Sequence, residues 1–255
     1  NKTKFFPDSK LNYTENILKK KSDKLAINFL SEKGFEENIT WNELYEKVCK
    51  FSSYLKKLNL QKGDRVAAYV PNKIETIICF LACAKNGIIW SSCSPDFGAQ
   101  GVVDRFKQIE PKVFITCDYY YYNGKKINIL DKVEKILKQI PSIKKVIAFN
   151  YNKQERESLK NFINFEETLK NDLDEVFERF EFNHPIYILF SSGTTGKPKC
   201  ITHGSGNVLI EHNKEFMLHC DIRENEKLFY YTTTGWMMWN WLVGGLATGS
   251  SIFLF

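Results

Sequence analysis

Four hydroxyl residues, two glycines and a lysine lie close together immediately after the apolar run at residues 187–190. The hydroxyl groups belong to Ser191, Ser192, Thr194 and Thr195, and the turn-permitting glycines are Gly193 and Gly196. Hydroxyls donate hydrogen bonds, and glycine allows tight turns in which several backbone N–H groups face one anion. Lys199 adds a full positive charge. This composition predicts a loop that binds phosphate groups.

The spacing excludes the common P-loop. That motif needs four residues between its glycines and a Ser or Thr directly after its lysine, whereas two residues separate Gly193 from Gly196 and Pro198 follows Lys197. The nine-residue signature at residues 191–199 instead resembles the phosphate loop of the adenylate-forming superfamily, which includes acyl-CoA synthetases, luciferases and peptide-synthetase adenylation domains. The alternative is a flexible surface loop between two strands.

The resemblance covers most of the chain. Residues 39–44 and 84–90 are similar to two upstream blocks of the superfamily. Within it, the chain resembles the acetoacetyl-CoA synthetase family at residues 11–16, 94–98, 104–111 and 232–241. Acetyl- and propionyl-CoA synthetases are the second reading, and a non-catalytic nucleotide-binding fragment is the third.

The resemblance implies a two-step ligation of acetoacetate to CoA. The carboxylate attacks the α-phosphorus of ATP to give acetoacetyl-adenylate and pyrophosphate, and the CoA thiolate then displaces AMP. ATP, Mg²⁺ and CoA are the expected cofactors. The signature residues 191–196 and Lys199 are expected to bind the phosphates of ATP, with Thr195 and Lys199 acting in catalysis through charge neutralisation and alignment.

Three residues after Gly235 are predicted to line the acyl pocket, namely Trp236, Met237 and Met238. Acetyl- and propionyl-CoA synthetases usually have a small apolar residue and a threonine where this chain has the two methionines. Methionine adapts to a small keto acid without offering strong hydrogen bonds. The alternative is an ordinary aromatic helix face.

A second substrate contact is expected at Asn123, Gly124 and Lys125. In acetyl-CoA synthetases a basic, glycine-containing segment at this position contacts CoA. Lys125 keeps one charge, but Tyr122 replaces the expected arginine. A tyrosine-rich strand that ends in an Asn-Gly turn is an equally good interpretation.

Histidines give no metal site. His212 and His219 are seven residues apart on a predicted helix, yet no carboxylate or cysteine completes a ligand spacing with them, so we expect a helical surface and no metal-ligating side chains. Mg²⁺ is expected to be held mainly by ATP oxygens and water.

Composition narrows the class further. The chain has 255 residues and is 43% hydrophobic, which suffices for a substantial core. Its net charge is +6. Its basic runs lack interleaved aromatics, so we expect small-molecule substrates and no nucleic acid. No run reaches the roughly 18–20 apolar residues of a membrane span. Seven cysteines without a C-x-x-C pair indicate buried thiols in a reducing compartment, hence the cytoplasm.

Helical and strand patterns alternate along the chain. Helices are predicted at residues 40–58, 74–85, 101–109, 127–140, 207–219 and 236–247, and strands at 65–70, 88–93, 113–117, 145–149, 186–190, 200–203 and 228–231. Such alternation predicts an α/β fold with helices packed on largely parallel sheets. The polar stretch 151–183 suggests a subdomain boundary between residues 1–183 and 184–255.

We expect the chain to be an N-terminal piece of a longer enzyme. It starts without methionine and ends inside an apolar run, and members of the resembled family are well over twice as long. Their ribose-binding aspartate, hinge and small C-terminal domain have no counterpart here. The 255 residues alone are therefore expected to be inactive.

Overall fold

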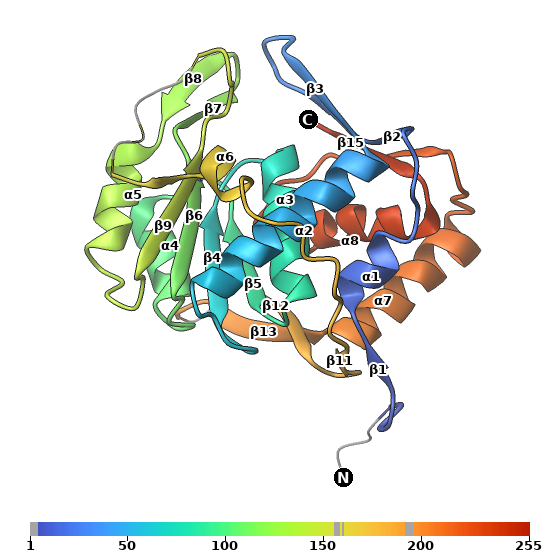
Figure 1. The fold of residues 1–255 in the computed structure, drawn as a ribbon. Helices are drawn as coiled ribbons and strands as arrows, with labels where there is room; N and C mark the ends of the chain where they lie inside the picture. The colour runs from blue at the N-terminus through green and yellow to red at the C-terminus, as the bar shows by residue number, and fades with distance from the viewer. Residues whose placement is uncertain (1–4, 156–158, 160, 192–195) are drawn as a thin grey trace.

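The computed structural model describes residues 5–155, 159, 161–191 and 196–255 (Figure 1). The helices are α1 (Tyr13–Ile17), α2 (Trp41–Lys57), α3 (Ile74–Lys85), α4 (Ala99–Phe106), α5 (Leu130–Leu137), α6 (Phe165–Thr168), α7 (Ser205–Lys214) and α8 (Met237–Gly244). The strands are β1 (Lys10–Leu11), β2 (Leu25–Leu30), β3 (Glu36–Thr40), β4 (Arg65–Tyr69), β5 (Ile89–Cys93), β6 (Val113–Cys117), β7 (Tyr119–Tyr122), β8 (Lys125–Asn128), β9 (Lys145–Phe149), β10 (Ile163–Asn164), β11 (Phe180–Glu181), β12 (Pro185–Ser191), β13 (Lys199–Gly204), β14 (Lys227–Phe229) and β15 (Ser251–Leu254).

The largest sheet formed by the described residues has seven strands in the order β10-β9-β6-β4-β5-β12-β13. Neighbouring strands are parallel except for the antiparallel pair β12–β13 at one edge. Every residue of β5 and β6 is buried, as is typical of parallel strands covered on both faces. The predicted α/β class with a largely parallel sheet is confirmed.

Two successive connections in this sheet run in opposite directions. The chain passes from β4 through α3 to β5, and then from β5 through α4 back past β4 to β6. Because parallel crossovers are right-handed, α3 and α4 lie on opposite faces of the sheet. α2 packs on α3 and α4 packs on α5, which gives the layers visible in Figure 1. The carboxyl ends of β4, β5 and β6 therefore surround a topological switch point, where open sheets leave a crevice.

A second sheet has the order β14-β15-β2-β3 among the described strands. β15 is parallel to both of its neighbours, and β2 and β3 form an antiparallel hairpin. Ile27 of β2 lies between Ile252 and Ile39, and all three side chains are buried. Residues on either side of position 183 thus share both sheets, since β12 also pairs with β5.

Helix α2 follows directly from its sequence. Thr40 accepts a hydrogen bond from the Glu43 amide at 3.2 Å, and the Glu43 carboxylate accepts one from the Thr40 amide at 2.8 Å. This is the predicted capping box, and it starts the helix at Trp41. The apolar stripe of α2 then packs on α3, in which every residue is buried.

Two local predictions were wrong. Residues 127 and 128 belong to β8 rather than to the following helix, which starts at Leu130, because they pair with β7 in a hairpin. His212 is not on a helical surface: its side chain is buried beside Gly244 and Phe216, whereas His219 is exposed. His212 is buried because α7 packs against α8.

Candidate active site

The phosphate-loop signature connects the two antiparallel strands β12 and β13. Ser191 ends β12 and pairs with Lys199, the first residue of β13. Gly196 and Lys199 are exposed, so the ammonium group is accessible to an anion from solvent. The predicted phosphate-binding residues Ser192, Gly193, Thr194 and Thr195 lie outside the described residues.

Gln108, just after α4, holds the C-terminal arm of this loop. Its side-chain amide donates hydrogen bonds to the carbonyl oxygens of Pro198 at 2.9 Å and Asp104 at 2.7 Å. Its oxygen lies 3.7 Å from the Cys200 sulfur. Sequence reasoning missed Gln108, because nothing in the local pattern connects it with a loop ninety positions further along.

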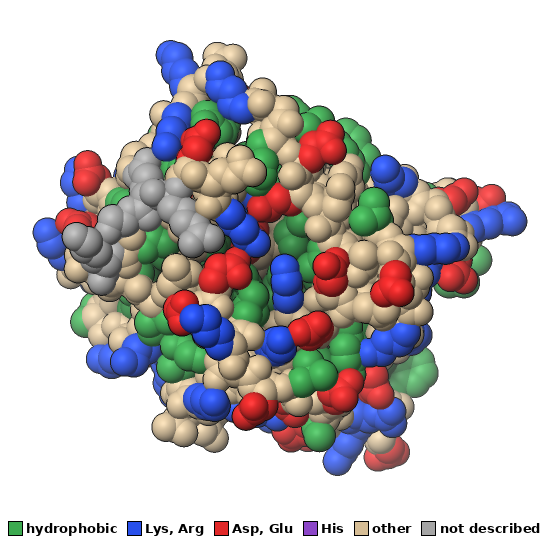
Figure 2. All heavy atoms as spheres, turned by 45° about the horizontal axis from the view of Figure 1, so that its top comes forward, with side chains coloured by type: hydrophobic (Ala, Val, Ile, Leu, Met, Phe, Trp, Pro, Cys, Tyr) green, Lys and Arg blue, Asp and Glu red, His purple; other side chains and the backbone are tan. Residues whose placement is uncertain are grey.

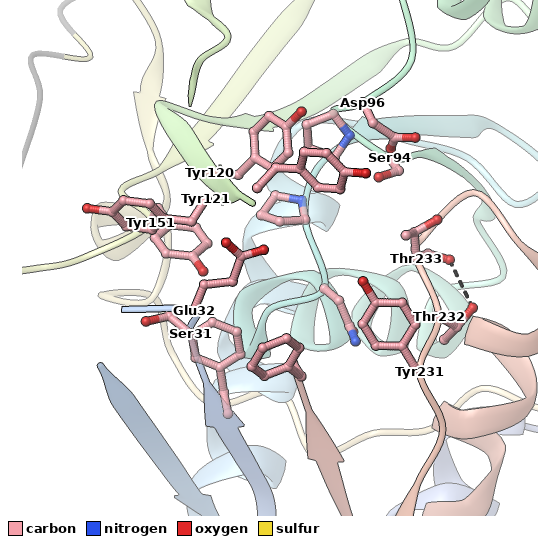
Figure 3. Close-up of a pocket in the computed structure, with 16 residues that line it drawn as sticks. Ser31, Glu32, Ser94, Asp96, Tyr120, Tyr121, Tyr151, Tyr231, Thr232 and Thr233 are labelled. Carbon is pink, nitrogen blue, oxygen red and sulfur yellow. Dashed lines mark hydrogen bonds between the residues drawn. The ribbon is translucent and has the colours of Figure 1, made fainter. Parts of the chain in front are cut away.

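A cavity of about 280 Å³ lies at the topological switch point (Figure 3). Its walls include residues 71–72 after β4, 94–96 after β5, 120–122 in β7 and 231–233 before α8. None of the described signature residues lines it. The sequence predicted strands β4 and β5 and the loops that follow them. It did not predict the strand order that brings these loops together.

Two carboxylates and several phenols face this cavity. Glu32 and Asp96 are acidic, and Tyr120, Tyr121 and Tyr151 supply hydroxyl groups. Burial raises the pKa of Tyr120, and the negative charge of Asp96 raises it further. Burial also raises the pKa of Tyr151. Both side chains are therefore neutral phenols at neutral pH and can donate hydrogen bonds to carbonyl or amide groups of a ligand.

A buried ammonium group supports one wall of the cavity. Lys73 is fully buried, and its nitrogen lies 4.3 Å from the centre of the Phe29 ring and 5.3 Å from that of Tyr151. It forms an ion pair with Glu37 and lies 3.8 Å from a carboxylate oxygen of Glu75. Cation–π contact and ion pairing together fix the two rings that line the cavity.

Residues 231–234 are held against the large sheet by buried hydrogen bonds. The Thr234 hydroxyl donates to the Val70 carbonyl at 2.7 Å, and the Ser92 hydroxyl donates to the Thr234 carbonyl at 2.6 Å. This attachment fixes the start of the segment predicted to line the acyl pocket. Trp236 and Met237 are 65% and 50% exposed, and Met238 is half-buried, so the first two side chains are open to solvent.

The predicted CoA contact is the turn of the β7–β8 hairpin. Asn123 and Gly124 have φ angles of 50° and 72°, and Tyr122 pairs with Lys125 across the turn. These angles belong to the two-residue hairpin turn that Asn-Gly favours. Lys125 is exposed. The tyrosine-rich strand and turn are thus present, and they leave these three residues accessible to a ligand.

The described residues contain no group of three or more His, Cys, Asp or Glu residues placed to hold a metal ion. No helix among them has the length and apolar character needed to cross a bilayer. Five cysteines are buried and free, while Cys200 and Cys220 are exposed. On the face shown in Figure 2, basic and acidic side chains are interspersed.

The fold is an α/β domain with a cavity at its topological switch point, and comparison with known proteins places it in a family. Residues 14–255 match the model of the AMP-binding enzyme family, and the chain belongs to this family.

Three relatives are more specific. Acetoacetyl-coenzyme A synthetase of Rhizobium meliloti (strain 1021) is 45% identical over 99% of this chain. Acetoacetyl-CoA synthetase of Gallus gallus is 43% identical over 98% of it. The solved structure of acetoacetyl-CoA synthetase from Streptomyces lividans superposes with a TM-score of 0.94 at 39% identity and covers 98% of the chain. In each case the chain spans 39% of the relative's length.

Proposed function

We propose that the polypeptide containing this chain ligates acetoacetate to CoA with consumption of ATP. Acetoacetyl-adenylate is the intermediate, and acetoacetyl-CoA, AMP and pyrophosphate are the products. The observation that carries the proposal is the similarity to acetoacetyl-CoA synthetases over nearly the whole chain, including the segment 232–241. The ligase class and the substrates are inferred for the whole polypeptide.

In the first half-reaction, this chain contributes the phosphate loop. MgATP is the substrate, and the metal ion arrives with its phosphates. We assign phosphate binding to Ser191, Ser192, Gly193, Thr194, Thr195, Gly196 and Lys199, with Thr195 and Lys199 in catalysis. The exposed Lys199 ammonium supports this assignment, because an accessible cation at the base of the loop can stabilise the departing pyrophosphate. Gln108 positions the backbone next to Lys199 through its hydrogen bond to the Pro198 carbonyl oxygen.

In the second half-reaction, the chain contributes a route for the thiol. We assign CoA binding to Asn123, Gly124 and Lys125, and the acyl pocket to Trp236, Met237 and Met238. The cavity between the β7–β8 hairpin and residues 231–233 supports this assignment, since its lining includes Tyr122, which precedes the turn, and Thr233, which shortly precedes the acyl-pocket segment. Its neutral phenols suit the amide groups of the pantetheine arm.

The test is acyl-dependent AMP release by the full polypeptide with ATP, Mg²⁺ and CoA. Acetoacetate should give the highest kcat/KM among acetoacetate, acetate, propionate and longer acids. Preference for acetate or propionate would make the protein an acetyl- or propionyl-CoA synthetase and would refute the assignment of the two methionines. If no acid supports AMP release, the non-catalytic reading replaces the proposal.

Two further assignments complete the proposal. We infer that residues 1–183 form a first subdomain and that residues 184–255 are the start of a second, whose first strand is β12. We infer a cytoplasmic location, which the buried free thiols support because such groups persist in reducing compartments. Limited proteolysis tests the boundary, since preferential cleavage should occur in the polar stretch before residue 184.

A further inference from the structure

Two hairpins from different sheets meet at the edge of the cavity. The turn of the β2–β3 hairpin carries Glu32, and the β7–β8 hairpin carries Asn123 and Gly124. One carboxylate oxygen of Glu32 accepts a hydrogen bond from the backbone N–H of Asn123 at 3.1 Å. The other accepts one from the backbone N–H of Gly124 at 2.6 Å. The same carboxylate lines the cavity, into which it points from the β2–β3 hairpin in Figure 3.

The backbone of the turn explains why it holds an anion. Both Asn123 and Gly124 are in the left-handed region, at φ 50° and 72°, so their consecutive N–H groups point to the same side. Paired amides of this kind bind the oxygens of carboxylates and phosphates alike. Glu32 is therefore a ligand of this turn supplied by the chain itself.

Positive charge surrounds the turn. Lys125 follows the turn directly. The Lys33 nitrogen lies 4.0 Å from the position that a Cβ atom would occupy at Gly124. The Lys33 nitrogen is also 5.9 Å from the centre of the Tyr121 ring. Paired amides together with lysines favour a phosphate, which carries more charge than a carboxylate.

We propose that Glu32 competes with a phosphate group of CoA for the Asn123-Gly124 turn. This inference rests on the proposed function, because it takes CoA as the thiol substrate. The carboxylate and the phosphate need the same two amides, so Glu32 leaves the turn when CoA binds. Glu32 thereby lowers the affinity for CoA, keeps other anions from the turn, and joins the two hairpins while no thiol is bound.

The experiment replaces Glu32 in the full polypeptide. Glu32→Gln keeps the size of the side chain and removes its charge. The KM for CoA should fall about three- to tenfold, the effect of losing one exposed charge-assisted contact, while kcat and the KM values for ATP and acetoacetate stay unchanged. Pantetheine, which lacks phosphate, should react with the same kcat/KM in both proteins. Dephospho-CoA identifies the phosphate concerned: a retained shift points to the pyrophosphate, and a lost shift to the 3′-phosphate.

Two variants serve as checks. Glu36→Gln removes an exposed carboxylate at the start of β3 and should leave the KM for CoA unchanged. Glu32→Ala should lower it as Glu32→Gln does, whereas a purely structural role would raise it. An unchanged or raised KM in both Glu32 variants, with active wild-type protein, overturns the competition but not the proposed function. Wild-type protein that releases no AMP with any acid overturns the proposed function itself.

Discussion

The indole nitrogen of Trp239 donates a hydrogen bond to the side-chain oxygen of Asn72 across 2.9 Å. Trp239 belongs to α8, and Asn72 lies in the loop after β4 that lines the cavity. The Trp239 ring also stacks on Trp90 of β5, with centroids 6.4 Å apart. One polar contact inside an apolar cluster thus fixes α8, which carries the predicted acyl-pocket residues Met237 and Met238, to the large sheet.

Trp239→Phe should destabilise the protein by about 1–3 kcal/mol, because it leaves the buried Asn72 oxygen without its donor. Urea unfolding followed by circular dichroism measures this loss. Trp236→Phe is the matched control: Trp236 is 65% exposed, so its replacement should change the free energy of unfolding by less than about 0.5 kcal/mol. Equal losses in the two variants would contradict the role given to the hydrogen bond.

Lys73→Met should cost about 3–5 kcal/mol, since it removes the cation from buried carboxylates. Lys153 remains 3.5 Å from Glu75 and offsets part of that loss. Burial, no longer opposed by Lys73, then raises the pKa of Glu75, so the deficit should shrink as the pH falls and the carboxyl group becomes protonated.

Lys50→Met is the control for this experiment. Lys50 forms an exposed pair with Glu46 at 2.5 Å along α2, and such pairs contribute little. Thermal unfolding of both variants between pH 4 and pH 8 provides the comparison. A deficit in Lys73→Met that does not change with pH would show that the buried carboxylates do not take up protons.

The stability of the protein should fall between about pH 6.5 and pH 4 because of His212. Burial lowers the pKa of His212 to about 4, and its Nδ1 atom has no hydrogen-bond partner among the described residues. An unfolded histidine titrates near 6.5, so in this range the unfolded state binds more protons and stability rises with pH. The contribution is complete above about pH 6.5 and amounts to roughly 3 kcal/mol.

His212→Gln should flatten this part of the pH–stability profile. Its difference from wild type isolates His212 from the other histidines, of which His184 and His203 also have pKa values lowered by burial. The exposed His219 provides the control, and His219→Gln should keep the wild-type slope. The assignment fails if the slope survives in His212→Gln.

Lys199→Met should slow adenylation about 10- to 1000-fold, the range expected when one group that stabilises transition-state charge is lost. Acetoacetate-dependent exchange of pyrophosphate into ATP measures this step alone. Lys197→Met should have a smaller effect, since Lys197 is exposed within the loop rather than at the start of β13. A variant impaired only in thioester formation would remove Lys199 from the first half-reaction.

Met237→Ala and Met238→Ala should change the preference among acyl acids and leave the KM for ATP unchanged. The ratio of kcat/KM for acetoacetate to that for propionate measures the effect. Both residues follow a segment held by Thr234, so their backbone should keep its place. Identical ratios in wild type and variants would exclude both methionines from the acyl pocket.

Local signals predicted much of the fold. The capping box of Thr40 and Glu43 gave the start of α2, and the apolar runs of β5 and β6 gave two central strands. Strands β2 and β3 were missed, and the second neighbour of β2 is β15 at residues 251–254, a partner that no local pattern indicates. The burial of His212 was missed for the same reason, since it depends on a helix later in the chain.

The candidate site divides in the same way. The phosphate signature is contiguous, so residue types and spacing alone predicted it. The cavity is assembled from the loops after β4 and β5, from strand β7 and from residues 231–233, and its position depends on the order of strands in space. Contacts such as those of Gln108 with Pro198, or of Glu32 with Gly124, join residues that no local pattern relates.

The pairing of Ile27 with Ile252 has a consequence for biosynthesis. β2 emerges from the ribosome early, but its parallel neighbour β15 is translated only after the entire large sheet. Until then one edge of the β2–β3 hairpin has no partner, and an open strand edge can associate with other nascent chains. Productive folding of this region therefore waits for late synthesis, and a chaperone that shields β2 should raise the yield of native protein.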